Sequence, residues 1–370
     1  MSEKYYKIGY KDFNKILKTL LQEKMVDKVV SGKEKRNRFS ISPILVDNVD
    51  DLDGFPLSQL FVYNFGRTSS ASKFVHSKGG AMDEKIAMVG HPCDGRAIVE
   101  LSKKLQVNLE NVFMIILEDI GTIKGRNVRN LIKKEKFEEN DVVGEFLASE
   151  KLILKLKDGS MKEFSLDKDI ELNANCARCY RKKLDDDFDI AITPIVTEPF
   201  SDELLIRWGS ERGKTAVERS NVKLNDLSAE ELEKFKQLQE TIIDTASNRR
   251  EKELNEYLNN PDRIKDIAKC TMCGLCIRSC PVCFCKDCIL MKQRKDKDID
   301  KLSYQLTRVA HVGDACVGCG KCDQNCPPGL PLSFYFQTLN EYVKDTFDYV
   351  PGCDEMAPMP RSKEAVKDKA

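Results

Sequence analysis

The sequence has little that would mark a secreted, membrane-spanning or nucleic-acid-binding protein. Its 60 Lys and Arg residues balance 60 Asp and Glu residues, so a global attraction to nucleic acid or to an anionic membrane is excluded. No apolar run approaches the roughly 18 residues that a membrane-spanning helix needs. The first residues, MSEKYYKIGYKDF, carry charges where a signal peptide has its apolar segment. We therefore expect a cytoplasmic protein with no membrane insertion and no nucleic-acid partner.

Recognisable catalytic constellations are also absent from the sequence. It contains no Ser-His-Asp order, no pair of candidate catalytic carboxylates and no Walker-type phosphate loop. We identify no catalytic residue, and we do not expect the chain to transform an organic substrate unaided.

What the sequence does have is 15 cysteines. In a reducing compartment such thiols persist mainly as metal ligands or reactive groups rather than as disulfides.

Two copies of one cysteine motif lie in the last third of the chain. The motif C-x2-C-x2-C-x3-C-P occurs once between Cys270 and Pro281 and again between Cys316 and Pro327. This spacing wraps three thiolates around one 4Fe-4S cluster and sends the fourth thiolate to the neighbouring cluster. We therefore predict two clusters, one on Cys270, Cys273, Cys276 and Cys326, and the other on Cys316, Cys319, Cys322 and Cys280.

Two other interpretations of this block are weaker. Buried structural cysteines do not explain two tandem matches, and zinc sites prefer two C-x2-C pairs to a run of four thiols. A zinc-stabilised scaffold stays an alternative that metal analysis would decide. The long segment between Cys280 and Cys316 contains helical stretches, so the block resembles the iron-sulfur modules of fumarate reductase and heterodisulfide reductase subunits. Clusters with only cysteine ligands move single electrons.

The pattern of apolar residues predicts an α/β domain with a β-rich extension, followed by a mainly helical dicluster ferredoxin-type domain. Helical spacing predicts a helix over residues 10–29, and a capping box of Ser228 and Glu231 opens a long charged helix over 229–258. An Asp-Gly turn predicts a hairpin over 151–166. The other expected strands are 41–46, 60–65, 86–90, 112–117, 189–196, 203–208 and 214–219.

Composition divides the 370 residues into five segments, and a chain of this length is sufficient for two or three domains. We expect an N-terminal helical segment at 1–39, an α/β domain at 40–226, a charged linker helix at 227–262, the dicluster domain at 263–350 and a flexible tail at 351–370.

Cysteines outside the tandem motifs suggest a further metal centre. Cys93 follows an expected strand and a Gly-His-Pro turn, so it lies where a helix begins and where amide groups and the helix dipole favour a thiolate. Such a thiol suits a metal ligand or a nucleophile, although a small residue packed in a tight turn is the alternative. We predict a third cluster on Cys93, Cys176 and Cys179, with a fourth ligand from Cys283, Cys285 and Cys288, and we interpret Cys353 as structural.

The order of these motifs resembles a known family. VGHPCDGRAIVEL, the Asp-Gly hairpin, CARCYRKKLDDDFDIAIT and IRWGSERGKTAVERS follow one another, as in beta subunits of deazaflavin-coenzyme hydrogenases and methanogen-type formate dehydrogenases. PCDGRAIVEL is also similar to beta subunits of sulfhydrogenases and anaerobic sulfite reductases. The resemblance covers about residues 40–225. It implies an α/β domain that binds FAD and is joined to iron-sulfur clusters, which pass electrons between a two-electron carrier and a catalytic partner.

The segment FGRTSSASKFVHSKGG is where we expect the flavin phosphates, because it offers hydroxyls, amide groups and positive charge near the Pro-Cys turn. A polar surface loop is the alternative interpretation of this segment. The candidate flavin-binding residues are Gly66, Arg67, Thr68, Ser69, Ser70 and Lys73.

The sequence thus predicts an electron-transfer subunit of an anaerobic, hetero-oligomeric oxidoreductase complex. It would link a hydrogenase, formate dehydrogenase or heterodisulfide reductase partner to a soluble electron carrier. The alternative is an electron-wiring adaptor that has clusters only, with no flavin and no substrate site. The visible spectrum of the anaerobically purified protein would separate the two.

Overall fold

An eight-stranded mixed sheet forms the centre of the first part of the chain. The computed structural model describes residues 4–66, 68–167, 169–294 and 298–362, and its large sheet has the strand order β11-β1-β10-β9-β5-β4-β2-β3. The strands are β1 (Tyr6–Gly9), β2 (Lys28–Glu34), β3 (Ile41–Val46), β4 (Ile86–Gly90), β5 (Val112–Leu117), β9 (Ile190–Pro194), β10 (Glu203–Trp208) and β11 (Asn225–Asp226).

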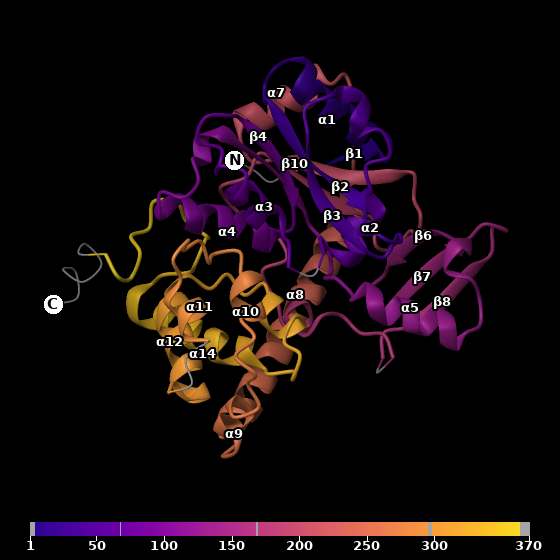
Figure 1. The fold of residues 1–370 in the computed structure, drawn as a ribbon. Coiled ribbons are helices and arrows are strands. Elements are labelled where there is room, and N and C mark those ends of the chain that lie inside the picture. The colour runs from indigo at the N-terminus through magenta and orange to yellow at the C-terminus, as the bar shows by residue number, and fades with distance from the viewer. Residues whose placement is uncertain (1–3, 67, 168, 295–297, 363–370) are drawn as a thin grey trace.

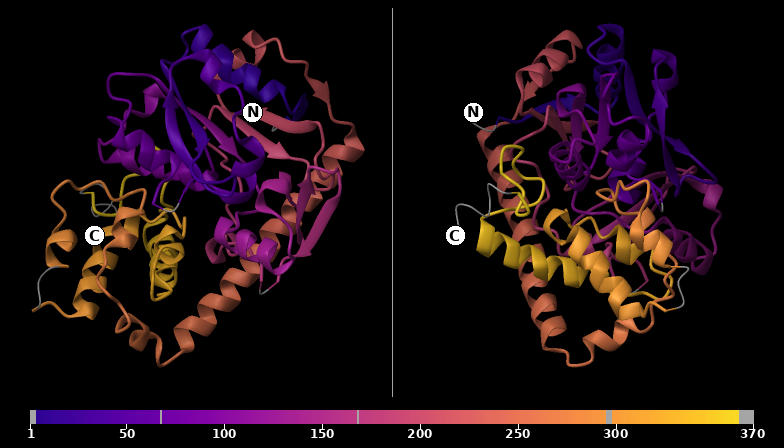
Figure 2. Two further views of the ribbon diagram at one scale, coloured as in Figure 1. Left: turned by 45° about the vertical axis from the view of Figure 1, so that its right-hand side comes forward. Right: turned by 60° about the vertical axis from the view of Figure 1, so that its left-hand side comes forward.

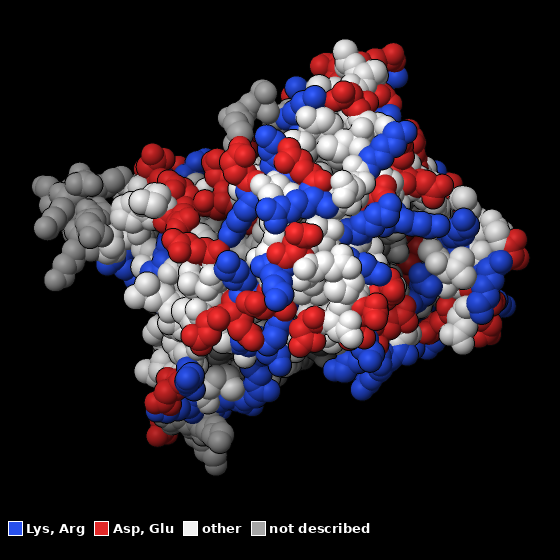
Figure 3. Space-filling view, turned by 90° about the horizontal axis from the view of Figure 1, so that it is seen from above, with Lys and Arg blue, Asp and Glu red and all other residues white. Residues whose placement is uncertain are grey.

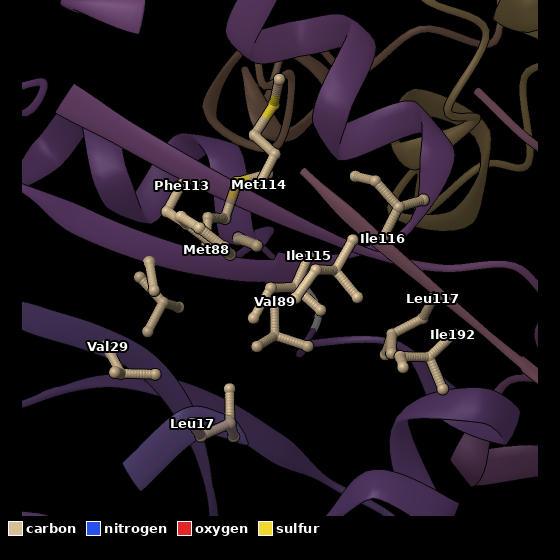
Figure 4. Close-up of a cluster of buried hydrophobic side chains, with 14 of the residues drawn as sticks. Leu17, Val29, Met88, Val89, Phe113, Met114, Ile115, Ile116, Leu117 and Ile192 are labelled. Atoms are coloured by element: carbon tan, nitrogen blue, oxygen red, sulfur yellow. The ribbon is translucent and has the colours of Figure 1, made fainter. Parts of the chain in front are cut away.

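The middle of this sheet is parallel and covered on both faces. Strands β2, β4, β5 and β9 run parallel, and every residue of β4 and β5 is buried, as expected where helices cover both faces. Figure 1 shows α1 (Asp12–Gln22) and α7 (Glu211–Arg219) on one side of the sheet, with α3 (Ala71–Ser77) and α4 (Pro92–Lys103) on the other. Figure 4 shows the resulting core, in which Leu17 of α1 and Ile192 of β9 lie beside β4 and β5.

A smaller antiparallel sheet extends from the large one and has its own hydrophobic core. It consists of β6 (Val142–Leu147), β7 (Lys151–Leu156) and β8 (Met161–Ser165), and it lies beside α2 (Leu57–Tyr63) and α5 (Gly125–Lys134). The remaining short elements of this half are η1 (Val49–Leu52), η2 (Leu109–Asn111), η3 (Glu139–Asp141) and α6 (Ala174–Ala177).

The second part of the chain is helical. The 31-residue helix α8 (Ala229–Asn259) begins at the expected capping box of Ser228 and Glu231 and runs diagonally from the sheet region to the far end of the helical part (Figure 2). The helical part continues with α9 (Arg263–Ile267), α10 (Leu275–Arg278), α11 (Ile289–Gln293), α12 (Lys301–Val312), η4 (Gly313–Ala315), α13 (Lys321–Gln324) and α14 (Leu332–Phe347).

The end of the described chain returns to α4. The hydroxyl of Tyr349 and the backbone N–H of Gly352 both donate to the buried carboxylate of Glu100, at 2.5 and 2.8 Å. Arg361 donates to the carbonyl of Ala310 at 2.7 Å. Residues 349–361, most of which belong to the expected flexible tail, therefore form hydrogen bonds with both the α/β part and α12.

The expected fold class is confirmed, as are the strands at 41–46, 86–90 and 112–117 and the hairpin at 151–166. Two expected strands are wrong. Residues 60–65 lie largely in α2, almost all of whose side chains are buried, and a short apolar run cannot separate a buried helix from a buried strand. Residues 214–219 lie in α7, which Ser210 caps by accepting the N–H of Gly213.

The expected helix over 10–29 is too long. Helix α1 ends at Gln22, and Lys24 adopts a left-handed φ of 52° that turns the chain into β2. The valines that follow are β-branched and favour a strand, so the first 39 residues contribute β1 and β2 to the large sheet as well as α1.

Charges of both signs alternate over the surface. Figure 3 shows Lys and Arg side chains interspersed with Asp and Glu side chains across the face seen from above. Within the described ranges, no helix combines the length and the apolar character needed to cross a bilayer.

Candidate iron-sulfur centres and an adjoining cavity

The carboxyl ends of the parallel strands bring the first candidate residues together. His91 and Cys93 follow β4, and Asp119 follows β5. Because the carboxyl ends of parallel strands meet at one edge of a sheet, these side chains share that edge. The Nδ1 atom of His91 lies 2.5 Å from an Asp119 carboxylate oxygen. Burial lowers the pKa of His91, but Asp119 outweighs burial and raises that pKa above its usual value.

The Pro-Cys unit has the predicted form. Helix α4 begins at Pro92, with His91 and Asp94 forming a reciprocal cap, and its residues Ile98 and Leu101 are fully buried. Cys93 lies in the first turn of α4, as expected. Burial, however, raises the pKa of its thiol well above the usual value, and Asp94 adds to that rise. A metal ion bound to this thiol would offset the cost of burying a thiolate.

The pair Cys176 and Cys179 lies on and just after α6, close to Cys93. Burial raises the pKa of Cys176, whereas Arg96 and Lys182 outweigh burial at Cys179 and lower its pKa. The charge of Cys93 acts on the same Arg96 guanidinium as that of Cys179. The structure thus brings the three α/β thiols of the predicted third cluster into one region.

Two buried basic side chains lie among these thiols. No carboxylate pairs with Arg96 in the described part of the chain, whereas burial lowers the pKa of Lys321 and the charge of Asp94 opposes that effect. Arg96 is 2% exposed and donates to the carbonyls of Arg181 and Val317, both at 3.3 Å. Lys321 is 4% exposed and donates to the carbonyls of Phe65 and Gly66. Buried charges are normally paired. A thiolate-ligated iron-sulfur cluster, which carries net negative charge, would supply the counter-charge that Arg96 lacks.

The tandem motifs line two separate small cavities in the helical part. Each cavity takes three thiols from one motif and one from the other, which is the crossed arrangement that the spacing predicts. Helix α12 contributes to both, with Tyr304 and Gln305 at one cavity and Arg308 at the other. The first cavity holds Cys270, Cys273, Cys276 and Cys326, and the second holds Cys280, Cys316, Cys319 and Cys322.

Glycines give the two motif loops their shape. Gly274 and Gly320 each follow the second cysteine of a motif and have φ values of 72° and 67°, a left-handed conformation that costs other residues about 1–2 kcal/mol. Each glycine precedes a four-residue helix, α10 or α13, that carries the third cysteine.

Hydrogen-bond donors surround the sulfurs of the first cavity, as is usual for an iron-sulfur cluster. Gln305 donates to the Cys270 sulfur at 3.1 Å, and backbone N–H groups of Met272 and Leu330 donate to the sulfurs of Cys270 and Cys326, both at 3.3 Å. Hydrogen bonds of this kind to cluster sulfurs are usual. Within the described ranges, no group of three or more His, Cys, Asp or Glu side chains converges on a single ion site.

The three spare thiols lie next to the tandem motifs. Cys283 and Cys280 share a hydrogen bond that lowers the pKa of Cys280 to about 5 and raises that of Cys283. Cys285 is exposed, and Cys288 precedes α11. Cys353, which we interpret as structural, also interacts electrostatically with Arg96, as do Cys179 and Cys93.

The contact between the two halves of the chain is polar and was not predicted. Arg178, whose side chain is 2% exposed, pairs with Glu253 of α8 at 2.6 Å, donates to the Ser333 hydroxyl at 3.0 Å and stacks on Phe334. Asn175 donates to the carbonyl of Gly318 at 3.3 Å. An arginine and an asparagine next to Cys176 look like ordinary surface residues in the sequence, so no sequence signal identifies this contact.

The segment expected to bind flavin phosphates faces the helical part. Lys73 donates to the carbonyl of Cys280 at 2.9 Å, and Ser70 accepts the N–H of Lys73 as the cap of α3. Gly66 donates to the carbonyl of Ile41 and accepts from Lys321. Thr68 is exposed and Ser69 donates to Gly66, whereas Arg67 lies outside the described residues.

A large cavity lies beyond Asp119, between the large sheet and the hairpin sheet. Its volume is about 500 Å³, which is within the range typical of small-molecule and cofactor sites. Aromatic side chains and two lysines reach it from several elements, and Asp119 and Ile120 connect it to the thiol region. Its lining includes Tyr10, Lys11, Phe61, Asp119, Ile120, Phe146, Lys155, Val196 and Phe200.

Comparison with protein families matches two parts of the chain. Residues 83–246 match the family described as the C terminus of the coenzyme F420 hydrogenase/dehydrogenase beta subunit. Residues 266–330 match the 4Fe-4S dicluster domain, which includes all eight cysteines of the tandem motifs.

Several curated proteins are similar to the chain. The F420-dependent formate dehydrogenase subunit beta of Methanocaldococcus jannaschii is 29% identical over 93% of this chain and 92% of its own length. The F420-dependent formate dehydrogenase 1 subunit beta of Methanococcus maripaludis is 30% identical over 93% of this chain and 90% of its own length. The sulfhydrogenase 2 subunit beta of Pyrococcus furiosus is 26% identical over 40% of this chain and 55% of its own length.

A solved structure shares the fold. A chain of the F420-reducing nickel-iron hydrogenase complex of Methanosarcina barkeri superimposes with a TM-score of 0.54 at 10% identity, over 69% of this chain and 91% of that one.

Proposed function

Because the chain belongs to the family of coenzyme F420 hydrogenase and dehydrogenase beta subunits, we propose that it is the iron-sulfur subunit that connects a catalytic partner to coenzyme F420. The family and the dicluster domain support an oxidoreductase subunit with an electron-transfer role. The names of the two relatives suggest the rest of the proposal: a formate dehydrogenase as the partner and coenzyme F420 as the carrier.

The observation that carries this proposal is the order of the sites along the molecule. The large cavity reaches Asp119 and Ile120, and Lys182 joins the carbonyls of Ile120 and Cys176 at 2.7 and 2.6 Å. Cys93 and Cys319 interact electrostatically, and Cys319 belongs to the nearer of the two tandem-motif cavities. A two-electron site, a thiol centre and two clusters thus follow one another.

The chemistry requires such an order. Oxidation of formate to carbon dioxide releases two electrons and one proton, and coenzyme F420 takes up two electrons and two protons, so the second proton comes from solvent. Clusters carry one electron each, and FAD, when bound, supplies the conversion between single and paired electrons. The cysteines of the tandem motifs would hold the two clusters, and the surrounding residues bury these thiols wholly or in part.

We place the FAD proposal in the large cavity. The cavity offers aromatic surfaces from Tyr10, Phe146 and Phe200 for a planar ring, and Lys11 and Lys155 for phosphate charge. In the segment at 66–73, by contrast, Lys73 and Gly66 already bond to the helical part of the chain, and the Ser70 hydroxyl caps α3.

Val196→Trp should fill part of the cavity and deplete flavin while leaving iron unchanged. Lys73→Ala, which tests the segment at 66–73 as the flavin site, should keep flavin. Flavin is measured by fluorescence after acid extraction of anaerobically purified protein, with Leu258→Trp on exposed α8 as the control for an added indole. Flavin loss in Lys73→Ala but not in Val196→Trp would instead place the flavin site in the segment at 66–73. A wild-type chain that is free of flavin would support the clusters-only adaptor.

We also propose the third cluster on Cys93, Cys176 and Cys179. Cys176→Ser should lower the iron content from about twelve to about eight per chain, since each cubane holds four irons. The fourth ligand is tested by comparing Cys353→Ser with Cys283→Ser, Cys285→Ser and Cys288→Ser. Loss of about four irons identifies the ligand, and a wild-type chain with no more than about eight irons rules the third cluster out.

The partner is tested by anaerobic co-purification. A formate dehydrogenase catalytic subunit is the expected companion of the chain. A hydrogenase or a heterodisulfide reductase subunit in its place would change the reaction that feeds electrons into the clusters.

A further inference from the structure

Helix α12 lies between the two cysteine motifs in the sequence and between their two cavities in the fold. Three of its residues, Tyr304, Gln305 and Arg308, are 0%, 2% and 1% exposed. Tyr304 and Gln305 line the cavity of Cys270, Cys273, Cys276 and Cys326, and Arg308 lines the other cavity. One buried helix face therefore serves both cluster sites.

Arg308 is a buried cation without an acidic partner. Across the described ranges it forms no ion pair with a carboxylate, and its Nε atom has no hydrogen-bond acceptor. Its guanidinium stacks on the ring of Phe336, 5.1 Å from the ring centre, and its Nη1 atom lies 4.0 Å from the sulfur of Cys283. A full positive charge at this depth requires a counter-charge nearby.

The charge of Arg308 reaches thiols of both cluster sites. Arg308 lines the second cavity and lies one helical turn after Tyr304, which lines the first, and its guanidinium interacts electrostatically with Cys276, Cys316 and Cys322. Cys276 belongs to the first cavity, and Cys316 and Cys322 belong to the second. Arg308 thus lies at the wall of the second cavity and close to the first, so its charge is near both cluster sites.

We propose that Arg308 is a shared counter-charge of the two clusters, which raises both of their reduction potentials together. The proposal rests on the two clusters of the proposed function. Each cluster gains one electron on reduction and becomes more negative, with no bond made or broken, so a nearby fixed cation stabilises the reduced form. Because the guanidinium is buried, salt and solvent screen this interaction little.

Gln305 provides a contrast on the same helix. Its amide donates to the sulfur of Cys270 at 3.1 Å, so it acts on one cluster alone. Hydrogen bonds to cluster sulfurs also raise reduction potentials. A shared effect of Arg308 and a one-sided effect of Gln305 can therefore be told apart.

The test is a redox titration followed by electron paramagnetic resonance, after iron analysis has shown two clusters in the wild-type chain. Arg308→Met is made in Cys319→Ser and in Cys276→Ser backgrounds, each of which keeps one of the two clusters. We expect the ratio of reduced to oxidised cluster at a fixed potential to fall at least tenfold in both backgrounds, about 59 mV for a one-electron couple. Gln305→Leu should lower it only where the Cys270 cluster remains. Lys292→Met, at an exposed lysine paired with Asp287, should change neither.

Further variants separate charge from packing. Arg308→Lys should keep both potentials within about threefold of the wild-type ratio, whereas the neutral Arg308→Gln should behave like Arg308→Met. A shift of one cluster only, or of neither in a protein with full iron content, overturns the proposal. If Arg308→Met and Arg308→Gln lose iron, retention of both clusters by Arg308→Lys supports the counter-charge, and iron loss in Arg308→Lys as well overturns it. A wild-type chain without two clusters would instead contradict the proposed function.

Discussion

Replacing Cys276 or Cys319 by serine should remove about four irons per chain in each case, since each residue belongs to a different four-thiol cavity. The double variant should lose about eight. Ligation contributes to the stability of the fold, so we also expect the region at 265–335 to become sensitive to proteolysis. Iron analysis and limited proteolysis under anaerobic conditions measure both effects.

Crossed ligation makes this prediction sharper. Cys326→Ser should remove the same cluster as Cys276→Ser, so combining them should cost no more iron than either alone, although they lie in different motifs. The double variant Cys276→Ser, Cys280→Ser should lose both clusters, although the two cysteines belong to the same motif. Unchanged iron in both Cys276→Ser and Cys319→Ser would exclude the assignment.

Gly320→Ala should loosen the contact between the two halves of the chain. Gly320 has a φ of 67°, and a Cβ atom there would lie 2.4 Å from the Cγ atom of buried Asn175 on α6. Backbone strain costs about 1–2 kcal/mol, and the forced overlap adds about 1–3 kcal/mol. Asn175 cannot simply turn away, because its side chain bonds to Gly318 and Arg178.

Gly318→Ala is the matched control for this effect. Gly318 lies in the same loop with a φ of 70°, but a Cβ atom there would meet nothing within 4 Å. It should therefore show the strain without the overlap. Anaerobic urea unfolding compares the two variants, and equal losses of unfolding free energy would contradict a close approach at Gly320.

The parts of the fold that the sequence predicts are those specified by local patterns. Strands β4 and β5 are continuous apolar runs bounded by turns, and the Asp-Gly turn specifies the hairpin of β7 and β8. Helix α2 has an equally apolar run, but tertiary packing on all sides makes it a helix. The end of α1 depends on the left-handed conformation of Lys24, which no residue type signals.

The same distinction applies to the candidate site. Motif spacing predicts the eight thiols of the two cavities and their crossed grouping, because three ligands of each cubane are close in sequence and the fourth cysteine of such a motif ligates the other cluster. Lys321 and Arg178 could not be predicted. Each looks like a solvated charge in the sequence, yet long-range contacts with Phe65 in one case and with Glu253 and Ser333 in the other bury it.

The helical part is attached to the α/β part at two places. Near the end of the described chain, Tyr349 and Gly352 bond to Glu100 of α4. Near the start of the helical part, Glu253 of α8 pairs with Arg178, which follows α6. A domain held at both ends cannot swing like an arm between donor and acceptor. The distances between the redox centres of this chain are then fixed. The rates of electron transfer between these centres should therefore be insensitive to solvent viscosity. Any gating of electron flow must occur where the partner docks or where the carrier enters.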